Sequence, residues 1–302
     1  MAEPLPPPAT APPAAEALGS RLPPLVVAAE RVAATVMQGV HGRRRAGQGD
    51  AFWQFRPYLP GDAVSRLDWR QSAKSDRLFV RETEWEAAQS VALWRDAGPG
   101  MAWRGGEGRP AKGERATLLL LALAALLLRG GERVRLFGLR RAHAGRGALP
   151  ALADALSRQD TPPRDESLPR HARAVLMGDF LAPLEDSRAA IAALAAQGVR
   201  GHLLQVLDPA EETLPYTGRV RFEGLGREAP LLLPRVEGVR ALYAERLAAH
   251  RAGLAAIAGA AGWSFATHRT DHPPETALLA LWQALAPTGL APTGLAGGVG
   301  GA

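Results

Sequence analysis

Short apolar runs alternate with longer segments of helical periodicity over most of this sequence. Short apolar runs are typical of buried strands, and we expect such strands at residues 91–94, 174–177, 202–207 and 263–267, while alternation of polar and apolar residues predicts a further strand at residues 133–139. Apolar positions spaced as on one face of a helix predict helices at residues 114–129, 149–156, 186–198, 239–257 and 275–285. This alternation predicts an α/β fold with a mostly parallel, doubly wound sheet.

Two segments depart from the alternation. Residues 218–233 predict a hairpin between the fourth strand and the long helix that follows. Before the first strand, a helix is expected at residues 28–38, followed by a glycine- and arginine-rich loop, an aromatic block at residues 52–69 and a strand at residues 78–84. Asp186, at the start of its helix, is expected to act as the N-terminal cap.

The ends of the sequence have the composition of disordered tails. Residues 1–24 are rich in proline and alanine, and residues 286–302 in glycine and alanine, so neither buries enough apolar area to offset its ordering entropy. Between them we expect a smaller N-terminal signature region over residues 25–88 and an α/β domain over residues 89–285.

Composition narrows the possible function classes. Cysteine is absent, which excludes disulfide scaffolds, thiolate zinc sites and cysteine nucleophiles and suits a reducing compartment. No basic and apolar leader is visible, and the longest apolar run, Ala116–Leu128, is shorter than the roughly 20 residues of a membrane span. The sequence therefore predicts a soluble cytoplasmic protein with no membrane span.

The excess of basic over acidic residues does not by itself indicate nucleic-acid binding. The isoelectric point is near 10.5, but arginines are scattered along the chain and only Lys74 and Lys112 are lysines. Arg43–Arg45 is the only tight basic run, and a solvated loop is the simpler interpretation of it.

No known catalytic motif is present. The sequence has no GxxxxGK[ST], GxSxG, HExxH or DxDx[TV] pattern. His268 and His272 are four residues apart, but Pro273 and Pro274 follow directly, which favours a loop over a metal-binding helix face. A well-built fold without a catalytic constellation is compatible with a protein that is not an enzyme.

Three predicted strands end in an aspartate, at Asp96, Asp179 and Asp208. Carboxylates that converge at the carboxyl ends of parallel strands could hold a hard divalent cation such as Mg²⁺. The alternative is that each aspartate caps the helix that follows, and for Asp179 and Asp208 this alternative is favoured.

The densest polar and aromatic segment spans residues 56–86. Its acidic and basic residues are matched in number, which indicates an ion-pair network more than a binding face of one sign. Tyrosine and tryptophan among the charges favour a structural or docking role over a simple charged hairpin. A catalytic role is disfavoured because no nucleophile lies beside a base.

This segment resembles a bacterial family, domain of unknown function 58. Its motifs are similar to R-x-Y-x-P-G-D, R-x-[IL]-D-W, S-A-[RK] and [LIV]-V-R-E, and the resemblance extends over residues 35–285. We take the residues that carry it as a partner-binding or structural signature: Arg56, Tyr58, Gly61, Asp62, Arg66, Asp68, Trp69, Lys74, Arg81 and Glu82.

The resemblance implies a von Willebrand factor A-like fold and, with it, a metal-ion-dependent adhesion site of sequence D-x-S-x-S. Here the motif begins at Asp96, and Gly98 and Gly100 replace the two serines. Asp179 fits the later aspartate, and Thr117 is a loose candidate for the threonine ligand. We therefore expect a degenerate metal site with no cofactor, or with weakly bound Mg²⁺, at Asp96, Asp179 and Asp208.

The resemblance also implies a partner, because genes of this family lie beside those of MoxR-type AAA+ ATPases. It suggests an adapter or co-chaperone that acts with such an ATPase on an unknown client complex. Two other functions stay open: a metal-dependent hydrolase that uses the three aspartates, and a nucleic-acid-binding protein that uses Arg43–Arg45.

Overall fold

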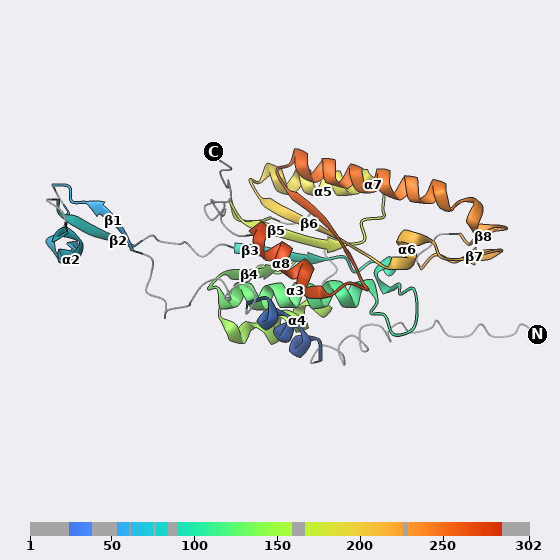
Figure 1. Ribbon diagram of the computed structural model, residues 1–302, viewed down its shortest axis with the longest axis horizontal. Coiled ribbons are helices and arrows are strands. Elements are labelled where there is room, and N and C mark those ends of the chain that lie inside the picture. The colour runs from blue at the N-terminus through green and yellow to red at the C-terminus, as the bar shows by residue number, and fades with distance from the viewer. Residues whose placement is uncertain are drawn as a thin grey trace, which may run out of the picture. The chain divides into compact units, whose positions relative to one another are not determined.

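The computed structural model describes residues 24–37, 53–60, 62–74, 77–83, 90–158, 167–225 and 229–285 (Figure 1). They belong to two compact units. The smaller unit lies within residues 37–89, and the larger one combines residues up to 36 with residues from 90 onward. The predicted tails, apart from Pro24, and Arg43–Arg45 lie outside the described residues.

A parallel five-stranded sheet forms the centre of the larger unit. Its strands are β3 (Ser90–Arg95), β4 (Arg133–Leu136), β5 (Arg173–Gly178), β6 (Arg200–Leu207) and β9 (Ser264–Arg269), in the order β4-β3-β5-β6-β9. Every described pairing is parallel. The first strand lies inside the sheet, so the strand order reverses between β3 and β5. The predicted α/β fold with a mostly parallel, doubly wound sheet is confirmed.

Helices cover both faces of this sheet (Figure 1). On one face α3 (Lys112–Arg129) packs against α4 (Leu149–Ser157) and α8 (Pro274–Leu285), and on the other α5 (Leu184–Ala196) packs against α7 (Arg240–Ala260). Every residue of α3 from Leu119 to Leu128 is buried, because its sequence is apolar all round. This helix therefore forms the centre of the core on its side of the sheet.

The helix expected at residues 28–38 runs over residues 24–37. Its apolar face is buried at Ala29, Val32, Ala33 and Val36. Residues 25–36 therefore group with the sheet, and not with the signature region in which the predicted boundary at residue 25 includes them.

Smaller elements complete the larger unit. The short helix α6 (Pro209–Thr213) follows β6, and the predicted hairpin consists of β7 (Val220–Phe222) paired antiparallel with β8 (Leu231–Leu233). The predicted capping role of Asp186 is wrong, because α5 begins earlier, after Pro183, and Asp186 lies in its first turn. Within the described residues no helix has the length and apolarity to cross a membrane.

The smaller unit is a two-stranded antiparallel ribbon with one short helix. Strand β1 (Trp53–Pro57) pairs with β2 (Phe79–Thr83), and α2 (Trp69–Ser72) lies between them in sequence. Asp68 caps α2, since its Oδ1 accepts a hydrogen bond of 2.7 Å from the backbone N of Gln71. The strand expected at residues 78–84 thus corresponds to β2.

Candidate functional site

The strand-end aspartates follow three neighbouring strands, β3, β5 and β6, at one edge of the sheet. The backbone N of Asp96 donates to the carbonyl of Met177 at 2.8 Å, which fixes the end of β3 against β5. Gly178 leaves room for the Asp96 side chain, because a Cβ at Gly178 would lie 2.9 Å from the Cβ of Asp96. This edge, beside the reversal in strand order, is where ligands bind in folds of this class.

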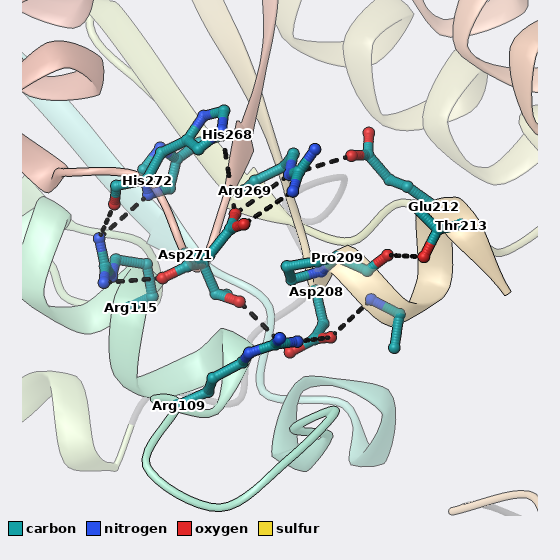
Figure 2. A network of polar contacts seen from close by, with 12 residues as sticks. Arg109, Arg115, Asp208, Pro209, Glu212, Thr213, His268, Arg269, Asp271 and His272 are labelled. Atoms are coloured by element: carbon teal, nitrogen blue, oxygen red, sulfur yellow. Dashed lines mark hydrogen bonds and ion pairs between the residues drawn. The ribbon is translucent and has the colours of Figure 1, made fainter. Parts of the chain in front are cut away.

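Asp208 is a buried cap and not an open ligand. Its Oδ1 accepts from the backbone N of Ala210 at 2.8 Å, and its Oδ2 accepts from the backbone N of Gly105 at 2.9 Å. The Thr270 hydroxyl lies 3.3 Å from Oδ2, and the Arg109 guanidinium lies 3.6 Å from Oδ1 (Figure 2). Both carboxylate oxygens are therefore engaged, as the capping alternative predicted.

Lys112 occupies the centre of the site. It begins α3 with a side chain that is 1% exposed, and its Nζ donates to Asp179 Oδ2 at 2.8 Å and to Glu211 Oε1 at 2.5 Å. Glu211 is held from the other side, since its Oε2 accepts from the backbone N of Asp208 at 2.9 Å. A buried ammonium thus sits between two carboxylates, and one of them, Asp179, is a residue that the resemblance assigns to the metal site.

The residues present do not fit a divalent ion. Gly98 supplies no oxygen from a side chain, and its backbone N donates to Asp96 Oδ1 at 2.7 Å. A Cβ at Gly100 would lie 2.8 Å from Asp179 Oδ2, so a serine there conflicts with the present position of that carboxylate. Thr117 is buried and its hydroxyl donates to the carbonyl of Gly113 at 2.7 Å. Among the described residues no group of three or more histidine, aspartate or glutamate side chains could hold a metal ion.

Burial shifts the pKa of two carboxylates near Lys112, Asp96 and Glu211, in the same direction. Burial raises the pKa of Asp96, the hydrogen bond from Gly98 opposes the rise, and the charge of Asp179 adds to it. Burial also raises the pKa of Glu211, while the adjacent ammonium of Lys112 lowers it. The two carboxylates are therefore held in a poorly solvated region whose counterion belongs to the chain itself.

A second polar network lies where β9 ends, beside the start of α3 (Figure 2). Arg115 donates to the carbonyls of Thr270 and His272 at 2.8 and 2.6 Å. Its NH1 lies 3.4 Å from Nε2 of His268, whose pKa is lowered to about 4, chiefly by burial. This network joins α3 to the loop after β9.

In the signature unit, the described aspartates bond to nearby backbone. Asp62 Oδ2 accepts from the backbone N of Leu59 at 2.8 Å and closes the turn after β1, while Asp68 caps α2. The backbone N of Tyr58 donates to the carbonyl of Leu78 at 2.8 Å, and Trp69 and Lys74 are exposed. Gly61 lies outside the described residues.

The ion-pair network expected of the signature stays a prediction. Arg56 and Val80 are paired in the ribbon, as are Phe55 and Arg81 and, one step along, Gln54 and Glu82. These pairings place the backbone of the motif residues but not their side chains. Arg66 ends the short turn that precedes α2.

Sequence reasoning missed Lys112 and Glu211. One signal was present for each: Lys112 is one of only two lysines and begins a helix whose later turns are apolar, and Glu211 completes a capping box with Asp208. Their pairing joins residues 99 positions apart, which no local pattern reveals.

Comparisons with known proteins place this architecture among uncharacterized relatives. The family described as "Protein of unknown function DUF58" matches residues 54–253. Uncharacterized proteins of Mycobacterium tuberculosis and Mycobacterium bovis are each 26% identical to this chain over 268 residues, covering 78% of it and 80% of their own length.

Two solved structures are also similar. An aerotolerance-related membrane protein from Bacteroides fragilis has 16% sequence identity to this chain and a TM-score of 0.37. The conserved hypothetical protein BatB from Bacteroides thetaiotaomicron has 15% sequence identity and a TM-score of 0.31. Each match covers 65% of this chain and 98% of the other.

Proposed function

Because this chain belongs to the DUF58 family of proteins of unknown function, we propose that it is a non-enzymatic protein-interaction module, an adapter or co-chaperone that acts with a MoxR-type AAA+ ATPase on a client complex in the cytoplasm. The ATPase is taken from the family resemblance. The geometry of the strand-end site and of the signature unit supports a docking role, as follows.

The position of Lys112 carries this proposal. In a metal-ion-dependent adhesion site the cation is supplied from solvent, and the partner completes its coordination with an acidic group. Here the cation is an ammonium fixed between Asp179 and Glu211 by hydrogen bonds of 2.8 and 2.5 Å. Binding at this edge of the sheet is therefore independent of divalent metal.

Trp69 supports a docking role for the signature unit. Its side chain is 64% exposed although it lies in a family motif, at the start of α2. Tryptophan is among the residues that most often contribute a large share of the binding energy at protein interfaces. Because Asp68 fixes α2 by capping it, the indole is presented from a defined backbone.

A pull-down experiment tests the proposal. Tagged protein is treated with chelator, washed, and incubated with lysate of the source cell under several nucleotide conditions, and retained proteins are identified by mass spectrometry. We expect a MoxR-type AAA+ ATPase, retained equally by chelated and untreated protein.

Two variants test whether the signature unit binds the partner. Trp69→Ala should reduce retention of the ATPase by about tenfold. Leu59→Ala, which removes another exposed apolar side chain of the same unit, is the matched control. Failure to retain such an ATPase under any nucleotide condition would contradict the proposal.

The geometry of the described residues gives no support to the alternative of a metal-dependent hydrolase. A hydrolase would need open carboxylates, but Asp208 is engaged as a cap and Asp179 by Lys112. It would be recognised by Mn²⁺-dependent phosphatase or nuclease turnover that is lost in Asp179→Asn. Nucleic-acid binding through Arg43–Arg45 stays a prediction, and a steep fall of affinity with salt would identify it.

A further inference from the structure

A cavity of about 230 Å³ opens beside the candidate site, at the reversal in strand order between β3 and β5. Its walls are mainly apolar and include Trp94, Phe180 and Ile191, while Asp96 and Asp186 are among the carboxylates that line it. Small-molecule sites usually measure about 300–1,000 Å³. This cavity is below that range and suits a single side chain.

One carboxylate of the cavity has an oxygen available to an incoming group. Asp96 Oδ1 accepts from the backbone N of Gly98, but within the described part of the chain no group donates to its Oδ2. Asp179 differs, because its Oδ1 accepts from the backbone N of Leu181 at 3.2 Å and its Oδ2 from Lys112. No basic side chain lines the cavity among the described residues, and the exposed Asp186 adds a second negative charge.

Hydrogen bonds to the backbone fix the segment that carries the aromatic wall of the cavity. The rings of Trp94 and Phe180 lie with their centroids 6.3 Å apart at an interplanar angle of 40°. Phe180 has a φ of 48°, a left-handed conformation that is costly for a residue with a bulky side chain. Two side chains hold this segment: His250 Nε2 donates to the Phe180 carbonyl at 2.6 Å, and Gln205 Nε2 donates to the Asp179 carbonyl at 2.9 Å.

We propose that this cavity binds the side chain of an arginine presented by the partner protein, with the guanidinium on Asp96 and its face against Trp94 and Phe180. The inference rests on the proposed interaction function and names the chemistry of the contact. A planar guanidinium bonds a carboxylate and stacks on aromatic rings, which a lysine ammonium does not do equally well. The apolar walls take the methylene stem. Recognition is thus reversed relative to a metal-dependent adhesion site, where the partner supplies an acid.

The cavity is tested directly with blocked arginine, N-acetyl-arginine amide, titrated into the isolated protein and followed by NMR. We expect saturable binding with a dissociation constant of about 1 mM, as its few atoms allow. The citrulline analogue, which has the same shape without the charge, should bind at least about tenfold more weakly because a charge-assisted hydrogen bond is lost. An absence of saturable binding, or equal binding of both compounds, overturns the proposal.

Two variants locate the binding. Asp96→Asn removes the charge, and Ser187→Trp fills the mouth of the cavity from α5, so both should weaken arginine binding by at least about tenfold. Their matched controls are Asp154→Asn on α4, whose carboxylate pairs with Arg158, and Ala189→Trp, an exposed position of α5. Because the two variants alter different elements, a folding defect in one leaves the other informative. Binding unchanged in both contradicts the assignment to this cavity.

The pull-down separates this inference from the proposed function. If blocked arginine binds but no AAA+ ATPase is ever retained, the proposed function fails and the arginine site stands. If the ATPase is retained equally by wild type, Asp96→Asn and Ser187→Trp, the interaction function stands and the arginine contact with that partner is overturned.

Discussion

Replacing Lys112 by methionine removes the internal cation while keeping an unbranched side chain of similar length. In the wild type the ammonium lies 2.8 Å from Asp179 Oδ2 and 2.5 Å from Glu211 Oε1. In the variant these two carboxylates face each other in a buried region without a counterion. We expect a large loss of folding free energy, smaller at low pH.

The magnitude follows from the contact distances and the burial. One unit-charge pair at 2.8 Å is worth about 6 kcal/mol at an effective dielectric constant near 20, before desolvation of the ions is subtracted. Removing one partner of a buried ion pair typically costs about 3–5 kcal/mol, which is a large part of the stability of a single domain. We expect a loss of this size at pH 7.

The pH dependence gives the test its specificity. Burial raises the pKa of Glu211, and replacing Lys112 removes the largest influence that opposes this rise. Only the hydrogen bond from the backbone N of Asp208 still opposes it, so the ionised form becomes less favourable in the folded state. A group with a raised folded-state pKa contributes stability that is complete below its ordinary value of 4.5 and is lost as pH rises through the folded value. The deficit of the variant should therefore shrink as pH falls from 7 toward 4.5.

Urea unfolding at several pH values measures this deficit. Lys74→Met, which changes the other lysine of the chain at an exposed position, is the control and should leave stability nearly unchanged. Adding Glu211→Gln to Lys112→Met should recover part of the loss. A variant as stable as wild type at pH 7, or a deficit that does not change with pH, would refute the reasoning.

Further predictions concern the sheet and the helices that cover it. Gly201→Ala should lower the free energy of unfolding by about 1–3 kcal/mol, because its Cβ would lie 2.5 Å from the ring of Trp263, which a hydrogen bond to Val199 holds in place. Gly259→Ala, on α7 with open space around it, should instead raise the free energy of unfolding by about 0.5–1 kcal/mol, and chemical unfolding measures both changes. Burial lowers the pKa of His202 and His268 from 6.5 to about 4, so the stability they contribute is present above pH 6.5 and falls as pH drops toward 4; an unfolding free energy that is flat across this window contradicts this.

The strands could be predicted from the sequence because their burial is a local property. Val91–Leu93 and Ala174–Met177 are consecutive apolar residues, and all of them are buried. The start of α5 could not be predicted in this way. Leu184, in the first turn, packs against Gly253 of α7, where an added Cβ would lie 2.4 Å from Leu184 Cδ1, so the helix begins before the apparent cap at Asp186.

In the candidate site, too, the short-range contacts could be predicted from the sequence and the long-range contacts could not. Capping by Asp208 was visible as a short-range alternative, because the helix it caps follows directly. The Lys112 contacts were not visible, since they join the starts of α3 and α6 with the end of β5 across the folded sheet. Charge balance in a buried site is a property of the tertiary structure, and a search for missing metal ligands could not indicate which cation takes their place.

The burial of α3 has a consequence for synthesis of the chain on the ribosome. Part of its apolar surface is covered by α8, which is translated roughly 150 residues later. At translation rates of about 5–20 residues per second, that surface waits about 8–30 s for its cover. The nascent chain therefore presents an adhesive apolar segment for much of its elongation, and efficient production should depend on a ribosome-associated holdase that shields α3 until translation ends.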